Sequence, residues 1–291
     1  YAEMGGQVGD SGTVFINDQT HLITDVLQDG SGRFLHALKS THSNSNLAGQ
    51  TAVLNVDIER RKAIQRHHTA THVLHWALRK VLGDHIRQAG SLVEPDRLRF
   101  DFSHFEGIKP EQIEEIERIS NEKLLLNDKL ESYEVPFSEK PEEVIAFFDE
   151  KYGDTVRVVN LGGWSQELCG GTHAARTGDI GIFRIVSEQG VASGVRRIEA
   201  ITGSAALAQV ESNEDLLSQA GSLVRADNHN LADKLRALID QNKKLEKTIA
   251  DLNRKLATGG VGPDIAESAI DLGGVKLVVS QLDGADPKSL P

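Results

Sequence analysis

The chain has 291 residues, a net charge of −11 and 39% hydrophobic residues, which is typical of a folded protein with two or three domains. The acidic balance argues against sequence-independent binding of nucleic acid over the whole surface, although clustered arginines permit one local basic face. No run is long and apolar enough to predict a membrane span, and a single cysteine excludes an internal disulfide. We therefore expect a cytoplasmic protein without a membrane partner.

The first 57 residues alternate short apolar runs with turn-forming stretches. The runs lie at residues 13–16, 21–27, 34–38 and 52–56. Gly, Asn, Asp and Ser separate them, for example at residues 28–32 and 43–46. Several short strands so close together predict a small β-barrel subdomain at residues 1–57.

A long helix is predicted over residues 58–82. Asp57 is a favourable N-cap residue, and Gly83 is a favourable residue to end the helix. His68 and His72 lie four residues apart within it, so both side chains project from one face, one turn apart.

The next part mixes strands and helices. Residues 98–102 alternate as a half-buried strand, with Leu98, Phe100 and Phe102 inward and Arg99 and Asp101 outward. Pro110 begins an amphipathic helix, and a shorter helix is predicted over residues 141–151. Further strands are predicted at residues 155–159, 181–186 and 195–201. This mixture predicts an α+β fold.

The C-terminal third carries a heptad pattern. Its seam consists of Leu231, Leu235, Leu238, Asn242, Leu245, Ile249, Leu252 and Leu256. Asn242 occupies an a position, where a buried Asn fixes the register. Because a separate helix is predicted at residues 213–224, an α-helical hairpin within the chain and a coiled coil between chains both fit the pattern.

These changes of pattern divide the chain into four predicted parts: a β-barrel subdomain at 1–57, an α+β core at 58–212, a helical linker at 213–259 and a further domain that begins at 260–291. Gly259 and Gly260 are expected to end the linker helix. The chain begins at Tyr1 rather than at an initiator methionine, and the last part stops just after a predicted strand. We therefore expect it to be part of a longer protein.

Two pairs of metal-ligand residues share one spacing. His68 and His72 form the first pair, and Cys169 and His173 form the second. Neutral imidazoles and a thiolate are preferred ligands of tetrahedral Zn²⁺, so the two pairs predict one zinc site. The sequence leaves open whether the zinc is catalytic or structural.

The residues between the ligands add detail. Thr69 stands where the zinc-protease motif requires a glutamate base, so the first pair is not that motif. Gly170 and Gly171 free the backbone of the second pair to wrap closely around a ligand.

Five motifs resemble the editing domain of alanyl-tRNA synthetases: HTATH at 68–72, LRFDFSH at 98–104, CGGTH at 169–173, TGDIG at 177–181 and GVRRIEAITG at 194–203. Residues 1–12 are similar to the Gly-rich motif that lies upstream of that domain. The heptad helix and the last residues resemble the linker and the start of the C-terminal domain, so the resemblance covers nearly the whole chain.

The resemblance implies hydrolysis of the aminoacyl ester of tRNA(Ala) that has been mischarged with serine or glycine. It places the zinc ligands at the four residues of the two pairs, and it implies catalytic roles for Cys169, Thr71 and Gln88. The Thr71 hydroxyl can hydrogen-bond a serine substrate, and the Gln88 amide can orient water or substrate but cannot act as a base. A capping threonine and a solvent-facing glutamine are the plainer alternatives.

The resemblance also implies partners: the acceptor end of tRNA(Ala) and the rest of the synthetase chain. The heptad pattern leaves open a homo-oligomer through the C-terminal region. Candidate substrate and tRNA contacts are Thr69, Arg99, Gly170, Gly171, Thr172, Arg196 and Arg197. Adjacent strand residues face opposite sides, so at most one of Arg196 and Arg197 points at a phosphate. The backbone N–H groups of residues 170–172 can contact the terminal ribose, or they can form a structural turn.

Three alternatives are weighed against this hypothesis. The editing module of threonyl-tRNA synthetases carries similar ligand pairs, but the double glycine at 170–171 and the heptad helix favour the alanyl type. A freestanding editing factor shares the core motifs, but the opening residues and the heptad helix favour a part of the synthetase. A zinc-stapled module that binds tRNA or oligomerises, without turnover, is the hypothesis from a different class.

Overall fold

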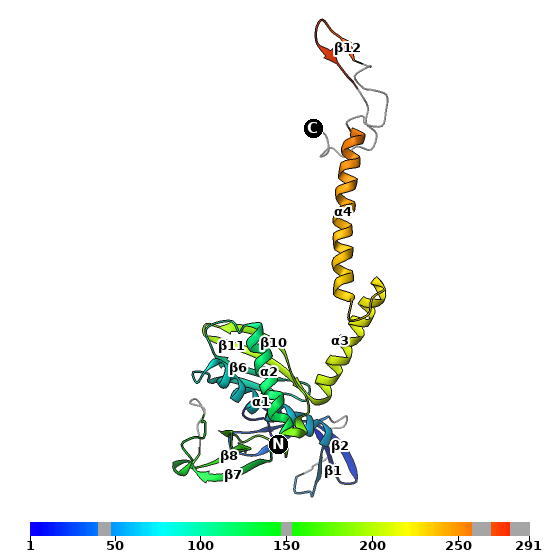
Figure 1. Ribbon diagram of the computed structural model, residues 1–291. Coiled ribbons are helices and arrows are strands. Elements are labelled where there is room, and N and C mark those ends of the chain that lie inside the picture. The colour runs from blue at the N-terminus through cyan, green and yellow to red at the C-terminus, as the bar shows by residue number, and fades with distance from the viewer. Residues whose placement is uncertain (40–47, 147–152, 258–268, 280–291) are drawn as a thin grey trace. The chain divides into compact units, whose positions relative to one another are not determined.

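A computed structural model describes residues 1–39, 48–146, 153–257 and 269–279 (Figure 1). The chain divides into two compact units, Tyr1–Glu211 and Ser212–Pro291. The first unit contains the antiparallel sheets and the helices that position the predicted ligands, so the α+β prediction is confirmed. The predicted boundary between residues 57 and 58 stays a prediction.

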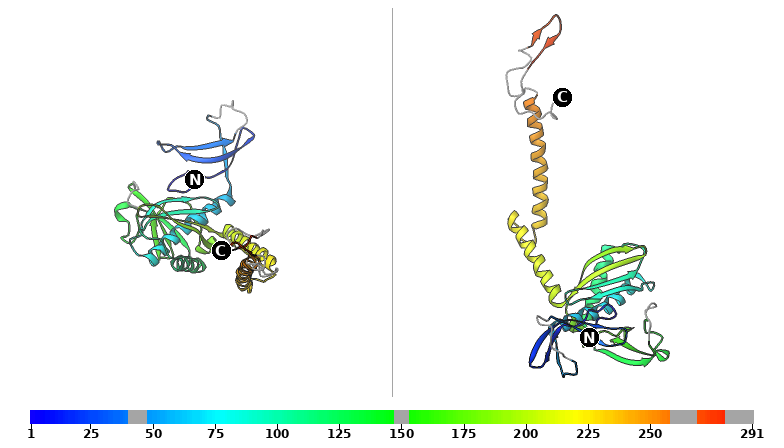
Figure 2. Two further views of the ribbon diagram at one scale, coloured as in Figure 1. Left: turned by 90° about the horizontal axis from the view of Figure 1, so that it is seen from above. Right: turned by 180° about the vertical axis from the view of Figure 1, so that it is seen from behind.

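The first four strands form an open antiparallel sheet, blue in Figure 2. They are β1 (Gly12–Ile16), β2 (Gln19–Gln28), β3 (Phe34–Lys39) and β4 (Val53–Val56). The strand positions are confirmed, but the predicted closed barrel is wrong for the described residues, since β3 and β4 lie at opposite edges in the order β3-β2-β1-β4. The turn predicted at residues 28–32 is present: Asp29 accepts hydrogen bonds from the backbone N–H groups of Ser31 and Arg33.

The long helix is α1 (Ile58–Leu82), as predicted. The Asp57 side chain accepts a hydrogen bond from the N–H of Arg60, and the N–H of Gly83 bonds to the carbonyl of Arg79. Helix α1 packs with α2 (Pro110–Leu125) and with a sheet of strand order β10-β11-β6-β5. Its strands are β5 (Gln88–Val93), β6 (Leu98–Ser103), β10 (Phe183–Ala192) and β11 (Val195–Thr202).

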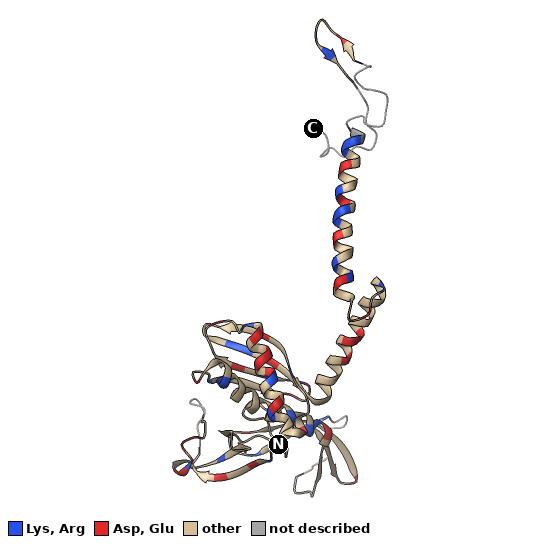
Figure 3. Cartoon of the chain, in the orientation of Figure 1, with Lys and Arg blue, Asp and Glu red and all other residues tan. Residues whose placement is uncertain are grey.

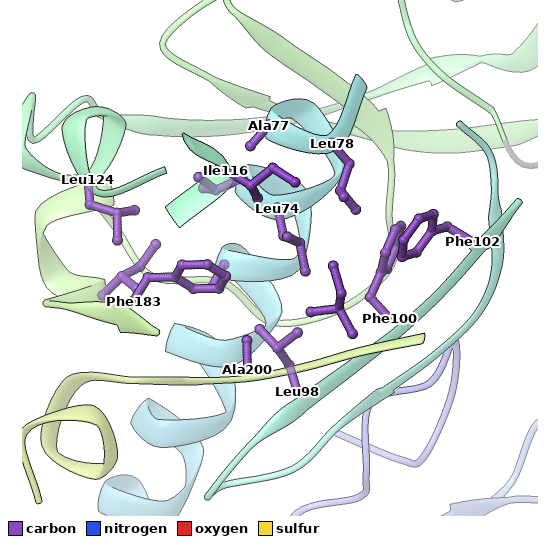
Figure 4. Close-up of a cluster of buried hydrophobic side chains, with 14 of the residues drawn as sticks. Leu74, Ala77, Leu78, Leu98, Phe100, Phe102, Ile116, Leu124, Phe183 and Ala200 are labelled. Carbon is purple, nitrogen blue, oxygen red and sulfur yellow. The ribbon is translucent and has the colours of Figure 1, made fainter. Parts of the chain in front are cut away.

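The core lies between these two helices and the sheet (Figure 4). Leu98, Phe100 and Phe102 on β6 are fully buried, as their alternation predicts. Asp101 faces the other side of β6, but it is only 8% exposed because Arg197 on β11 covers it with two hydrogen bonds. The predicted outward orientation of Asp101 is therefore right, and its expected exposure is wrong. Acidic residues, red in Figure 3, recur along α2, where Glu111, Glu114 and Glu122 are exposed.

A smaller antiparallel sheet completes the first unit, in the order β7-β8-β9. Its strands are β7 (Leu130–Pro136), β8 (Thr155–Leu161) and β9 (Ser165–Leu168); two short 3-10 helices, η1 (Phe137–Glu139) and η2 (Thr177–Ile180), flank it. The helix predicted over residues 141–151 is wrong for residues 141–146, and residues 147–152 lie outside the described residues. Ile145 exchanges backbone hydrogen bonds with Gln166 and Leu168 instead of forming a helical turn.

The second unit contains the helix predicted from the heptads, α4 (Leu231–Ala257), which carries charges of both signs along its length (Figure 3). Helix α3 (Gly203–Val224) contains the boundary between the units, and β12 (Ile270–Asp271) pairs with β13 (Lys276–Leu277). The predicted stop at Gly259 and Gly260 lies outside the described residues.

The heptad seam of α4 is largely uncovered. Leu235, Leu245 and Ile249 are 42%, 53% and 57% exposed, so within the described residues the predicted helical hairpin does not form on this seam. A coiled coil between chains stays a prediction. Among the helices that the structure describes, none combines the length and the apolar character that a membrane crossing needs.

Candidate functional site

The four predicted ligands meet in the first unit. His68 and His72 project from one buried face of α1, and Cys169 and His173 lie in the segment that follows β9. One ligand atom from each of the four residues lies within 4.8 Å of the ligand atoms of the other three. Two sequence segments that are about a hundred residues apart therefore form one cluster that can hold a metal ion.

The distances between the four side chains suit a small cation with tetrahedral coordination. Cys169 Sγ lies 3.3 Å from His68 Nε2 and 3.4 Å from His173 Nε2. The Nε2 atom of His72 is buried and, among the described residues, has no hydrogen-bond partner. An unpartnered buried nitrogen beside a thiol and two further imidazole nitrogens is a donor set that can hold a metal ion.

The electrostatics of the metal-free cluster favour the thiolate. Burial alone would raise the pKa of Cys169, but its contacts with His68 and His173 lower it well below its usual value. Burial, and then the charge of His68, lower the pKa of His173 to about 3, so its ring is neutral. Burial would also lower the pKa of His72, but Glu167 and Cys169 outweigh it and raise the pKa to about 10. A bound cation would displace that proton.

Each histidine of the cluster also has a partner for its second ring nitrogen. The Nδ1 contacts are His68 to Gln7 Oε1 at 2.7 Å, His72 to Glu167 Oε2 at 2.5 Å and His173 to Thr69 Oγ1 at 3.3 Å. The hydroxyl of Thr69 donates to the carbonyl of Gln65, so it accepts from His173. An Nδ1–H that donates outward leaves Nε2 with a lone pair that faces the cluster.

The loop between Cys169 and His173 packs tightly against this outer layer. A Cβ atom on Gly171 would lie 2.9 Å from Gln7 Oε1 and closer still to the His68 ring, which explains the glycine. Gln7 also accepts a hydrogen bond from the N–H of Thr172 and donates one to its hydroxyl. The Thr172 N–H is therefore bonded to Gln7, and its contact with a ribose stays a prediction. Arg157 on β8 donates to the carbonyl of Gly171 at 2.6 Å.

A cavity of about 460 Å³ opens beside the cluster. Its lining includes three of the four ligands, His68, His72 and Cys169, and also Tyr1, Met4, Gly5, Thr71, Gln88, Ser91, Gly153, Thr155, Val156, Arg157, Leu168, Gly170 and Gly171. Thr71 donates its hydroxyl hydrogen to the carbonyl of His67 at 3.0 Å, and Gln88 donates to the Ser91 hydroxyl at 3.3 Å. Thus the structure places both Thr71 and Gln88 beside the cluster.

Other predicted contacts do not line the cavity. Arg196 pairs with Glu188, and Arg197 pairs with Asp101. Arg99 lies on β6, where its Nε is 3.8 Å from an Asp101 oxygen. The side chains of Thr69 and Thr172 bond within the protein, as described above, and support the ligand loop.

The sequence analysis missed four residues of the site: Gln7, Arg157, Glu167 and His75. A signal exists for two of them. Glu167 precedes Cys169 by two residues on an extended segment, so it shares the face of a ligand. His75 follows His72 by three residues on α1, which places it on the same side of the helix. Nothing in the spacing of Gln7 or Arg157 points to the site.

One segment of the chain matches a family of domains from aminoacyl-tRNA synthetases. Residues 156–199 match the family model described as the threonyl and alanyl tRNA synthetase second additional domain. The matched segment contains β9 and the two ligands Cys169 and His173.

Longer similarity extends over the whole chain. The chain is 47% identical to the alanine–tRNA ligase of Opitutus terrae over 284 residues, which is 96% of this chain and 30% of that relative. It is 49% identical to the alanine–tRNA ligase of Pseudomonas syringae pv. tomato and 43% identical to that of Pseudoalteromonas translucida, in each case over 100% of the chain and 33% of the relative. The chain thus spans about a third of the length of these curated relatives, and over that part it is a homologue of alanine–tRNA ligases.

Proposed function

We propose that the first unit is an editing hydrolase that deacylates Ser-tRNA(Ala) and Gly-tRNA(Ala) as part of an alanyl-tRNA synthetase. One observation carries the proposal: the His/Cys cluster opens onto a cavity whose lining also contains Thr71 and Gln88. A cavity of about 460 Å³ suits a small ligand such as an aminoacyl group on a ribose.

Thr71 supplies the selection of serine over alanine. Its hydroxyl hydrogen is bonded to the carbonyl of His67, so the oxygen presents lone pairs to the cavity. A serine side chain donates a hydrogen bond to that oxygen, whereas the methyl group of alanine cannot. This contact favours serine over alanine, which lacks the hydroxyl; deacylation of the glycyl ester does not use it.

Hydrolysis requires a water molecule to attack the ester carbonyl carbon, after which the bond to the ribose oxygen breaks and that oxygen takes up a proton. Gln88 donates one amide hydrogen to the Ser91 hydroxyl, and its carbonyl oxygen can accept a hydrogen bond from the attacking water. His68, His72, Cys169 and His173 would hold Zn²⁺. With all four bound, the ion would fix the shape of the cavity wall, and it would supply Lewis-acid polarisation of an oxygen only where one ligand gives way to water or substrate.

Arg157 is a positively charged side chain in the lining of the cavity. It is half-buried, donates to the Gly171 carbonyl and the Ser132 hydroxyl, and forms no ion pair with a carboxylate among the described residues. Arg196 and Arg197, in contrast, are already paired with acidic side chains. We therefore expect Arg157 to contact a phosphate of the tRNA acceptor end.

The test is release of serine from Ser-tRNA(Ala), with Ala-tRNA(Ala) as the comparison, by the 291-residue chain before and after metal chelation. Serine-selective release that is lost on chelation and in Cys169→Ala supports the proposal. Undiminished activity of Cys169→Ala would refute the role of the cluster. Tight tRNA binding without release from either substrate would refute the hydrolase and favour the binding module.

A further inference from the structure

We infer that Glu167 is a positioning residue for the candidate metal site: held by His75, it fixes the ring of His72 and supplies the second negative charge that a divalent cation requires there. The inference deepens the proposed function and rests on its metal site. It does not depend on which aminoacyl ester the cavity accepts.

The Glu167 carboxylate bridges two histidines of α1. It lies on β9, is 2% exposed, and places Oε2 at 2.5 Å from His72 Nδ1 and Oε1 at 2.8 Å from His75 Nδ1. An ionised carboxylate only accepts hydrogen bonds, so both Nδ1 atoms carry a hydrogen. A neutral His72 ring then has its lone pair on Nε2, the buried atom that faces the other ligands.

His75 explains why the carboxylate keeps this orientation. It lies three residues after His72 on the same side of α1, and it is not one of the four clustered residues. Its ring is buried, 1% exposed, and lies against Phe100 with the ring centroids 5.5 Å apart. Because each oxygen of Glu167 is bonded to a different ring, the carboxylate cannot rotate away from His72 without losing a buried hydrogen bond.

Charge distinguishes Glu167 from the other outer partners. Gln7 and Thr69, which contact the rings of His68 and His173, are neutral. Among the four ligands only Cys169 can supply a negative charge, which leaves one positive charge of a divalent cation unbalanced. A buried charge is costly unless an opposite charge compensates it. Glu167, one imidazole ring away, provides that compensation.

Two substitutions separate shape from charge. In Glu167→Gln, the amide oxygen can still accept from His72, and the amide nitrogen can donate to His75 Nδ1 once that ring takes its Nε2–H tautomer, so mainly the charge is lost. In Glu167→Ala, both the charge and the hydrogen bond to His72 are lost. Outer partners of metal-ligating histidines typically change metal affinity by about 10–100-fold. We expect a loss of about 10-fold for Glu167→Gln and about 100-fold for Glu167→Ala.

The measurement is the Zn²⁺ affinity of the 291-residue chain, determined by competition with a chromophoric chelator. Gln166→Ala is the matched control, because Gln166 is the neighbour of Glu167 on β9 and faces away from α1. Co²⁺ titration gives a second readout, because its visible absorption reports tetrahedral coordination by a thiolate. We expect wild-type affinity for Gln166→Ala and weaker, altered Co²⁺ absorption for both Glu167 variants.

Wild-type Zn²⁺ affinity in both Glu167 variants would overturn the inference. If neither variant folds, as judged by near-ultraviolet circular dichroism, His75→Gln replaces them. This variant keeps a hydrogen-bond donor for Glu167 but removes the imidazole ring that fixes the carboxylate, so it should weaken Zn²⁺ binding several-fold. Unchanged Zn²⁺ binding would again overturn the inference. The proposed function fails separately. A chain that binds Zn²⁺ in a Glu167-dependent manner but releases no serine would sustain this inference and refute the editing hydrolase.

Discussion

Gly171→Ala is a severe test of the metal site, although it adds a single methyl group. A Cβ atom at this position would lie 2.9 Å from Gln7 Oε1 and nearer to two atoms of the His68 ring, whereas ordinary contacts of such an atom begin at 3.4 Å. The backbone of Gly171 is not in the left-handed region, so alanine would meet a steric obstacle and no conformational one.

The magnitude follows from the displacement. To restore an ordinary contact, the His68 ring must move by about 1.5 Å, whereas a metal ligand has to stay within about 0.2 Å of its ideal distance. Overpacking of this kind costs about 1–3 kcal/mol, and 2.7 kcal/mol corresponds to a factor of about 100 in a binding constant. We expect Gly171→Ala to weaken Zn²⁺ binding by about 100-fold and to abolish serine release.

Gly170→Ala provides the control. Its added Cβ atom would meet only the terminal methyl of Met4, at 3.2 Å, and Met4 is a flexible side chain that is 52% exposed. Both glycines line the cavity, so the two variants differ in what the new methyl group touches. Zn²⁺ affinity, measured by chelator competition, should stay within about threefold of wild type in Gly170→Ala. Equal affinities in the two variants would refute the tight packing of Gly171 against His68.

Four further predictions follow. Thr71→Val should lower the preference for Ser-tRNA(Ala) over Ala-tRNA(Ala) by about 10–100-fold in deacylation assays, because the serine hydroxyl loses its acceptor; an unchanged ratio would contradict the role of Thr71. Arg157→Gln should raise KM for Ser-tRNA(Ala) and reduce the salt dependence of binding, with little change in release of serine from a small seryl ester; equal losses on both substrates would contradict a phosphate contact. Phe100→Ala should lower the free energy of unfolding by about 3–5 kcal/mol in urea titrations, since Phe100 is fully buried beside His75; a loss below about 1 kcal/mol would contradict the packing. Hydrogen bonds from the Ser31 hydroxyl and the Arg33 N–H lower the pKa of Asp29 to about 2. The contribution of Asp29 to stability is therefore present above pH 3.8 and is lost as the pH falls through about 2. An NMR titration of the Asp29 carboxyl with a midpoint near 3.8 would contradict the lowered pKa.

The elements that the sequence predicted correctly are those that local chemistry determines. Asp57 and Gly83 set the ends of α1, and the alternation of residues 98–102 set which side chains of β6 face the core. The closed barrel failed for a non-local reason. Alternation locates strands, but it does not determine which edges pair, and β3 and β4 are the edges of an open sheet.

The ligand set was predictable, whereas its supports were not. Spacing and residue type predict His68 and His72 as ligands, and the same holds for Cys169 and His173. Gln7 contacts a ligand that is 61 residues away in sequence, so no local pattern joins it to the cluster. The spacing of Glu167 from Cys169 places it on the face of a ligand, but it does not show that the carboxylate meets His72, 95 residues away. For two adjacent residues of one strand, such as Arg196 and Arg197, alternation shows that the side chains point to opposite faces. It does not show which acidic residues they contact.

Gln7 shows why the cluster is not a property of the α+β core alone. Residues 1–57 were predicted to form a separate subdomain, yet Gln7 is fully buried and its amide bonds to His68, on α1, and to Thr172, in the ligand loop. One side chain thereby holds both halves of the ligand set in register. If residues 1–57 were removed, the His68 ring would lose the acceptor that orients it, and the Thr172 N–H would lose its partner. The N-terminal segment therefore contributes a side chain to the candidate site from the other side of the predicted boundary at residue 57.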